Sequence, residues 1–462
     1  MDDSAGASEG DSSEALREAD LPTVIEIVST GDLVLDVTFE NSKATLKSAR
    51  KAVPRIVVAP AAMTRLGFRV DVATLKRQSK YFEKLLTDTR FREAKAITAA
   101  LAALSLRNVK PAVAEFKDLP WIQITDDDEA TLYAHRDAAF ADLLRILHGK
   151  AATTSPVTMQ FVATLAVLAD RFDCAASISR FMSSGLKFKW PITQRKPLPG
   201  EDASMSRNTE NVLRQKILVA WLLNQPVKFA AATRELIMNG SCKWTSFPES
   251  DGQDEPTWWY LQDGLEEELQ HRRECILNTI ASVQRHFLKL YTSRTRQCKL
   301  GYDSSAACDS YQLGEMLKFL TNKNLMFLVD FSPASLDSIA DTSLLQIDPV
   351  LATLRQCPSY QIDKNHTNCG LRTRILSIVD FLQALLSANS IPIARMQWKT
   401  SRHTATWIPT DNEKDKEGVP KLFRFTRAVA GDQRLRFEHA IGADKFARDV
   451  FTAPDWNWTA EE

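Results

Sequence analysis

The sequence carries no excess of either charge: 58 Lys and Arg residues balance 58 Asp and Glu residues in a chain of 462. Nucleic acids and anionic membranes attract basic surfaces, so this balance argues against either as the main partner. The sequence also lacks an apolar run long enough to cross a bilayer. Its nearest candidate, Ala96–Leu106, is short and is interrupted by Thr98 and Ser105. We therefore expect protein partners, no membrane, and nucleic acid only as a minor alternative.

Cysteine is also scarce, with seven residues scattered along the chain. An odd and scattered set differs from the paired framework of small secreted domains. The first 20 residues are acidic and rich in Ser and Gly, which is the reverse of a signal peptide or a mitochondrial presequence. We therefore expect a cytoplasmic or nuclear protein. Residues 1–20 have almost nothing to bury, so they are predicted to be a disordered acidic tail.

Two common catalytic signatures are absent: a Gly-rich phosphate-binding loop and the His-Glu-x-x-His motif of zinc peptidases. His148 and His286 lie in segments with helical patterns and are expected to be structural residues rather than catalytic bases. The aromatic run of Trp258, Trp259 and Tyr260 is expected to be core or a helix-docking anchor rather than a ligand cage. These observations predict that the protein is not an enzyme.

Residue patterning divides the rest of the chain into four parts. Short apolar runs and helical patterns fill residues 21–186, which predicts a mixed α+β domain. Three Pro residues without periodicity mark residues 187–206 as a linker. Residues 207–390 are mainly helical, and the clearest pattern is Glu274–Tyr291, where apolar residues repeat at a spacing near 3.6. Residues 391–462 form the last part.

Several local patterns predict strands and inserts in the first domain. Val24–Val28 and Asp32–Phe39 are rich in β-branched residues and are separated by a Gly, so they are expected to be strands. Lys43–Ala62 is basic and contains two Pro residues. It is expected to be an inserted loop with one short strand, Ile56–Val58. A second insert is expected at Ala96–Asp118.

The C-terminal part is expected to contain a β-hairpin. Lys421–Arg427 and Arg434–His439 flank a Gly-Asp pair, and apolar residues alternate with charged ones in the second segment. Basic residues interleaved with aromatic ones can bind nucleic acid through phosphates and stacking. The neutral overall charge instead favours a strand pair with one face in a core and the other in water.

Two separated segments carry the most informative pattern in the sequence. The first segment is Phe68–Phe82, which an Asp-led apolar strand, Asp32–Leu35, precedes in the chain. The second segment is Phe140–Cys174, which contains Leu-Leu-x-x-Leu-His-Gly and Ala-Asp-Arg-Phe-Asp-Cys. The matching residues are Asp32, Phe68, Asp71, Leu75, Ser79, Tyr81, Phe82, Leu144, His148 and Asp170. Over roughly Gly31–Met182 they resemble a BTB/POZ domain of the fungal, ascomycete type. Asp71 stands where that family usually has a His that supports local hydrogen bonds.

This resemblance implies a mixed sheet capped by helices, with no chemistry of its own. Such a domain exposes an edge strand and a helical face, and either can bind another chain. The resemblance implies three kinds of protein partner: a second copy of the chain in a homodimer, a cullin-type ubiquitin ligase, or another protein. A cullin would dock around the predicted helix His135–His148 and the acidic segment before it, Asp126–Glu129. The alternative for that segment is a solvated acidic helix start.

Five residues in two polar loops form a candidate metal-ligand set, Cys298, Cys308, Cys357, His366 and Cys369. Zn²⁺ prefers four thiolate or imidazole ligands in a tetrahedral arrangement, which two loops together could supply. The hypothesis is a structural zinc that clips the loops together. The spacing is looser than in common zinc modules, so the alternative is half-buried free thiols. No other cofactor is expected.

The sequence as a whole predicts a scaffold protein. Its expected fold is an α+β, BTB/POZ-like domain, followed by a mainly helical region and a small C-terminal β element. The leading function is non-catalytic protein–protein interaction. Two alternatives stay open, a substrate adaptor for a cullin-type ubiquitin ligase and a transcriptional regulator with a basic tail that contacts nucleic acid.

Overall fold

The computed structural model describes residues 21–52, 60–186, 188–193, 206–245, 255–328, 342–367, 369–409, 422–432, 435 and 441–459. The chain divides into two compact units, Met1–Lys189 and Trp190–Glu462. The boundary lies inside the predicted linker, residues 187–206. The predictions of a disordered tail at residues 1–20 and of a strand at Ile56–Val58 fall outside the described residues.

The first unit is an α+β domain, as predicted, and its described residues form one mixed four-stranded sheet. The strands are β1 (Thr23–Glu26), β2 (Leu33–Glu40), β3 (Met63–Val70) and β4 (Trp121–Asp126), in the order β1-β3-β2-β4. β2 runs antiparallel to β3 and parallel to β4, whereas β1 runs parallel to β3. Residues of β2 are buried on both faces of the sheet, which fits its nearly continuous apolar sequence.

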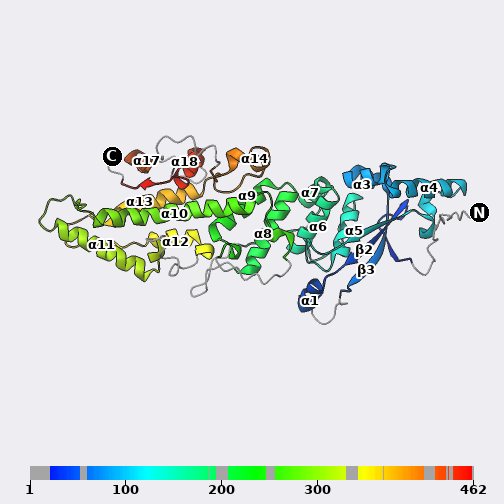
Figure 1. Cartoon of the computed structure of the whole chain (residues 1–462), viewed down its shortest axis with the longest axis horizontal. Coiled ribbons are helices and arrows are strands. Elements are labelled where there is room, and N and C mark those ends of the chain that lie inside the picture. Colours follow the sequence, from blue (N-terminus) through cyan, green and yellow to red (C-terminus); the bar gives the residue numbers. More distant parts are fainter. Residues whose placement is uncertain are drawn as a thin grey trace, which may run out of the picture. The chain divides into compact units, whose positions relative to one another are not determined.

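Helices flank this sheet (Figure 1). They are α1 (Lys43–Ala52), α2 (Val72–Gln78), α3 (Lys80–Thr87), α4 (Arg92–Leu106), α5 (Arg136–Leu147), α6 (Met159–Arg171) and α7 (Ala175–Ser184). Phe140 of α5 packs against Phe68 of β3 and against Phe172, with ring centroids 5.3 Å and 5.5 Å apart. Phe82 of α3 stacks on Phe172 at 5.3 Å. The two motif segments of the sequence therefore share one aromatic core.

The expected loop at the start of the first insert is wrong, because Lys43–Ala52 forms the helix α1. Its sequence is rich in Ala, Lys and Leu, which favour helix, and Ser42 accepts a hydrogen bond from the backbone N–H of Thr45 at 3.2 Å. The two Pro residues lie beyond this helix and do not interrupt it. The second insert is largely ordered by α4, which is followed by single 3₁₀ turns at Pro111–Val113 and Phe116–Asp118.

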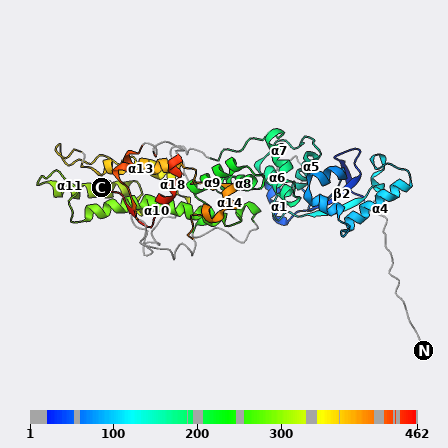
Figure 2. The ribbon, with the colours of Figure 1, turned by 90° about the horizontal axis from the view of Figure 1, so that it is seen from above.

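The second unit is mainly helical, as predicted, and its long helix α10 packs against several of the others. Figures 1 and 2 show α13 running beside α10. The helices are α8 (Arg207–Leu222), α9 (Pro226–Asn239), α10 (Leu265–Thr292), α11 (Ser305–Asn322), α12 (Ile347–Leu354), α13 (Leu371–Leu386), α14 (Arg395–Thr400), α15 (Arg402–Ala405), α17 (Arg427–Gly431) and α18 (Ile441–Phe451).

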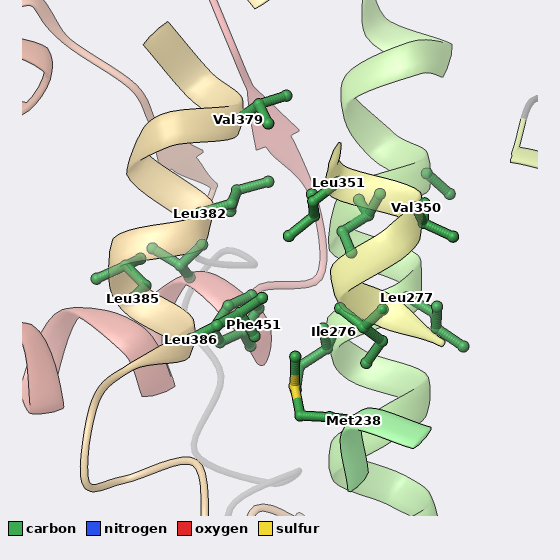
Figure 3. Close-up of a cluster of buried hydrophobic side chains, with 14 of the residues drawn as sticks. Met238, Ile276, Leu277, Val350, Leu351, Val379, Leu382, Leu385, Leu386 and Phe451 are labelled. Carbon is green, nitrogen blue, oxygen red and sulfur yellow. The ribbon is translucent and has the colours of Figure 1, made fainter. Parts of the chain in front are cut away.

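The core of the second unit forms where α10, α12, α13 and α18 meet. Figure 3 shows Leu382 and Leu386 of α13 pointing toward α12 and α10, with Phe451 of α18 beside Leu386. Ile276 of α10 and Leu351 of α12 approach from the other side, and all five side chains are buried. The apolar repeat that predicts α10 in the sequence is therefore the face that α10 turns to this core.

The predicted C-terminal hairpin is wrong in its pairing. Its first strand is only the short β5 (Phe423–Arg424), which pairs in parallel with β6 (Trp456–Asn457). The helix α17 then begins at Arg427, the residue where the first strand was expected to end. It occupies the place of the predicted hairpin turn. The second predicted strand, Arg434–His439, lies almost entirely outside the described residues. β5 and β6 pack onto the helical unit, so residues 391–462 do not form a separate element there.

Two consecutive buried arginines of α10 fix distant loops of the helical unit. Arg272 forms an ion pair with Glu268 of the preceding turn at 2.7 Å. Its guanidinium also donates to the carbonyls of residues 390–392 and of Ala405, at 2.6 to 3.0 Å. A buried guanidinium needs all its donors satisfied, and these backbone carbonyls satisfy them.

Arg273 makes the equivalent contacts on another side of α10. Its guanidinium donates to the carbonyl of Ile237, at the end of α9, at 2.8 Å. It also donates to the carbonyl of Thr342 at 2.7 Å and to that of Leu345. The last carbonyls of a helix have no partner within it, so Arg273 supplies the donor that the end of α9 lacks.

Replacing Arg272 with Met should lower the free energy of unfolding by about 3–5 kcal/mol, because the carboxylate of Glu268 is then buried without its partner. Arg355 offers a matched control, since its ion pair with Asp380 is exposed and its loss should cost less than about 1 kcal/mol. Urea denaturation of the full-length variants measures both values. Equally small losses would contradict the role given to Arg272.

Candidate metal centre

Three cysteines meet where three segments of the helical unit come together. Cys298 lies in the loop after α10, Cys308 in the first turn of α11, and Cys369 two residues before α13. The loop turns at Gly301, whose φ of +73° suits glycine. Cys308 and Cys369 lie at or just before the beginnings of α11 and α13.

The three sulfurs are close enough to share one ion. Their Sγ atoms all lie within 4.8 Å of one another, and Cys298 Sγ is 3.7 Å from Cys369 Sγ. None of the three is in a disulfide. Two thiolates on one tetrahedral Zn²⁺, with Zn–S bonds of about 2.3 Å, are about 3.8 Å apart. The cluster is mostly buried and could hold a thiophilic cation.

Polar side chains of α11 hold the two loops in place. The carboxylate of Asp309 accepts hydrogen bonds from the backbone N–H groups of Gln297 and Cys298, at 2.8 Å and 2.9 Å. One turn further along, Gln312 donates to the carbonyl of Tyr360 at 2.5 Å and accepts from the N–H of Leu371 at 3.3 Å. One helix therefore fixes both the loop of Cys298 and the loop that ends at Cys369. Sequence analysis missed both residues, because neither forms a recognisable motif.

The thiols are unequal in their readiness to ionise. Burial opposes ionisation at Cys298, but hydrogen bonds led by the side chain of Ser305 outweigh it and hold the pKa of Cys298 below its ordinary value. Burial raises the pKa of Cys308 to about 12, and burial together with the neighbouring Cys298 raises that of Cys369. Among the three, Cys298 is therefore the thiol that ionises most readily. A bound cation would supply the charge needed to ionise all three.

Cys357, a predicted ligand, lies apart from the cluster. It is buried in the apolar core, and its sulfur faces the carbonyl of Pro358 at 3.8 Å. Burial raises the pKa of Cys357 to about 11. The prediction that it joins the set is therefore corrected, and spacing along the chain could not have shown this.

His366, the other predicted ligand, lies outside the group of three sulfurs, three residues before Cys369 in the chain. Its side chain is buried, and its Nδ1 is 2.8 Å from Oδ1 of Asp363. Its Nε2 is 3.3 Å from the hydroxyl of Ser304, at the start of α11. The structure thus brings three of the five predicted residues together and leaves His366 outside that group, in contact with Ser304 and Asp363.

The motif residues of the first unit join its two halves. The backbone N–H of Asp71 donates to Nε2 of His148 at 3.1 Å. The hydroxyl of Ser79 donates to the carbonyl of Phe172 at 2.6 Å and accepts the N–H of Phe82 at 3.1 Å, which caps α3. His148 therefore has the structural role that the sequence predicts.

Asp32 and Asp71 both support the start of α2. Asp32 accepts the N–H of Val72 at 2.8 Å, and Asp71 caps the helix by accepting the N–H of Thr74 at 2.7 Å. The bond to Thr74 holds the pKa of Asp71 below its ordinary value. The other motif residues divide between the buried Phe68, Leu75, Phe82 and Leu144 and the exposed Tyr81 and Asp170.

In the acidic segment before α5, some carboxylates have partners within the fold and others are exposed. Asp126 pairs with the buried Arg136 at 2.7 Å, and Asp128 accepts the hydroxyl of Ser42 at 2.9 Å. Asp127 and Glu129 are exposed. Only half of the predicted acidic surface is therefore available to a partner.

Other residues singled out in the sequence have structural contacts. Nε2 of His286 lies 2.8 Å from the hydroxyl of Thr459. Trp258 and Trp259 are buried, and both indole N–H groups donate to the side chain of Asn211, at 2.7 Å and 2.8 Å. A Gly-x-Ser-x-Gly spacing at Gly6–Gly10 lies outside the described residues, and no strand pattern precedes it in the sequence.

The two described aromatic residues of the predicted basic tail, Phe423 and Phe425, pack in or against the core. Phe425 is buried, and its ring lies 6.0 Å from that of Trp458. Phe423 lies 5.6 Å from the same ring. Rings held in this way are not free to stack on nucleotide bases.

Comparison with known proteins gives no relative: no family model, no curated protein and no solved structure matches the chain. Within the described part of the chain, every helix is too short or too polar to cross a membrane.

Proposed function

We propose that the protein is a non-catalytic interaction protein whose first unit is a BTB/POZ-like domain of the fungal type. The observation that carries this proposal is the joining of the two motif segments. Asp71 bonds to His148 across 77 residues, and Ser79 bonds to Phe172 across 93. Motifs that matched by chance would have no reason to depend on each other for their hydrogen bonds.

The edge of the sheet offers a place for a partner. β1 lies at the end of the strand order and, among the described residues, pairs only with β3. Its other edge can accept a strand from a second chain, which is a common mode of protein recognition. A second copy of this chain and a different protein are both compatible with such pairing. The acidic segment before α5 gives weaker support to a cullin, because Asp126 and Asp128 are occupied within the fold.

The interaction proposal predicts that partners depend on the first unit. Affinity capture from the source organism would compare the full-length chain with a chain lacking residues 21–186. We expect at least one protein to be recovered only with the full-length chain. A full-length Val227→Glu variant is the control, because Val227 is exposed on the second unit and its change should leave that capture intact.

The identity of the captured molecules distinguishes the functions. A cullin lost on deletion would identify an adaptor, and capture that depends on added nucleic acid would identify a regulator. Recovery of the same proteins with both chains would contradict an interaction role for the first unit.

We also propose that Cys298, Cys308 and Cys369 hold a structural zinc ion. The three sulfurs lie within 4.8 Å of one another, the Cys298–Cys369 pair has the separation that tetrahedral zinc requires, and Asp309 and Gln312 hold their loops. Three converging soft ligands favour zinc over magnesium or calcium, which prefer oxygen. The ion would tie the loop after α10 to the segment before α13.

Zinc content tests this assignment directly. We expect the full-length protein to bind about one zinc ion, and Cys308→Ser to lose it together with part of the thermal stability, because structural zinc sites need their full ligand set. Cys357→Ser is the matched control, since Cys357 is an equally buried thiol outside the cluster. Zinc would be measured by elemental analysis and the melting temperature by calorimetry. Zinc-free wild-type protein, with a melting temperature unchanged by EDTA, would contradict the proposal.

A further inference from the structure

The three-cysteine cluster leaves one position of a tetrahedral site to be filled. Structural zinc sites are closed by four protein ligands, whereas an open position is typical of catalytic zinc. Cys357 lies away from the cluster, and Asp309 already accepts two backbone N–H groups. A buried donor carried by the loop of Cys369 is the imidazole of His366, three residues before that cysteine.

The imidazole of His366 is held in an orientation that prepares Nε2 as a ligand. Oδ1 of Asp363 lies 2.8 Å from Nδ1 of His366 and also accepts the backbone N–H groups of Asn365, at 2.7 Å, and of His366 itself, at 3.1 Å. A carboxylate on one ring nitrogen places the proton there and leaves a lone pair on the other. Metal-binding histidines are commonly oriented in this way.

The other ring nitrogen, Nε2, faces the start of α11, the helix that carries Cys308. Nε2 of His366 is 3.3 Å from the hydroxyl of Ser304, and the imidazole ring contacts the ring of Tyr302, with centroids 5.6 Å apart. Ser304 adjoins Ser305, whose side chain is a neighbour of Cys298. His366 also precedes Cys369 by three residues in the same loop. The loop that supplies Cys369 therefore also carries the imidazole, which lies outside the group of three sulfurs and would have to move from Ser304 to reach them.

We propose that Nε2 of His366 is the fourth ligand, which makes a Cys₃His zinc site with Asp363 as the positioning residue. This inference rests on the proposed structural zinc and adds its ligand set and its outer carboxylate. Binding requires Nε2 to exchange its contact with Ser304 for the ion. It closes the site to water, so the zinc stabilises the fold and has no open position for substrate.

X-ray absorption at the zinc edge of the full-length protein would count the ligands without any substitution. We expect three sulfur neighbours and one nitrogen neighbour of imidazole type. Four sulfurs, or three sulfurs and a water oxygen, would overturn the assignment of His366. Wild-type protein that takes up no zinc would instead overturn the zinc proposal itself, so the two failures are distinguishable.

Zinc affinity of full-length variants, measured by competition with a chromophoric chelator, supplies the second test. We expect Asp363→Asn to weaken zinc binding about 10- to 100-fold, since loss of an outer partner has that effect. His366→Ala should weaken it further, and His366→Cys should restore much of the affinity because a thiolate can take the place of imidazole. Cys357→Ser should bind as the wild type does. Wild-type affinity in both His366→Ala and Asp363→Asn would overturn the inference.

Discussion

The helical unit depends on the burial of two adjacent arginines, Arg272 and Arg273, in the first half of α10. A guanidinium stays charged at any physiological pH, so its burial is tolerated only where acceptors surround it. Here the acceptors are mainly carbonyls at the ends of helices and in loops, contributed by residues 237–238, 342–345 and 390–405. These carbonyls would otherwise be buried without partners. One turn of α10 therefore fixes the positions of segments far apart in sequence, and the core in Figure 3 forms within that frame.

The other end of α10 is secured by different chemistry. There the chain leaves the helix into a polar loop, and the nearby segments carry Cys298, Cys308 and Cys369 instead of buried ion pairs. In our account a zinc ion provides at this end the cross-link that the arginines provide at the other. The first unit has no comparable metal cluster among its described residues. Its polar contacts join the two motif segments.

The sequence correctly predicted elements whose formation depends on a local residue pattern. The predictions were wrong where contacts with residues distant in the sequence determine the structure. The apolar repeat of α10 and the mixed sheet were predictable, because burial imposes a period on each element. The prediction of a hairpin is wrong because β5 pairs with β6, whose sequence at Trp456–Asn457 gives no strand signal of its own. The prediction of a loop at Lys43–Ala52 is wrong because it gave more weight to two Pro residues than to the capping role of Ser42. Spacing suggested five metal ligands, yet only the fold could separate Cys357 from the others and place Asp309 behind Cys298.

The central claim is that the cysteine cluster is a local, metal-held clamp on a helical unit whose frame is set elsewhere. Hydrogen exchange measured by mass spectrometry on the full-length protein, with and without a zinc chelator, tests this claim most directly. We predict faster exchange after chelation in residues 294–310 and 357–371, with no change around Arg272 and Arg273 or in the first unit. Exchange that is unchanged everywhere, or faster throughout the helical unit, would contradict the account.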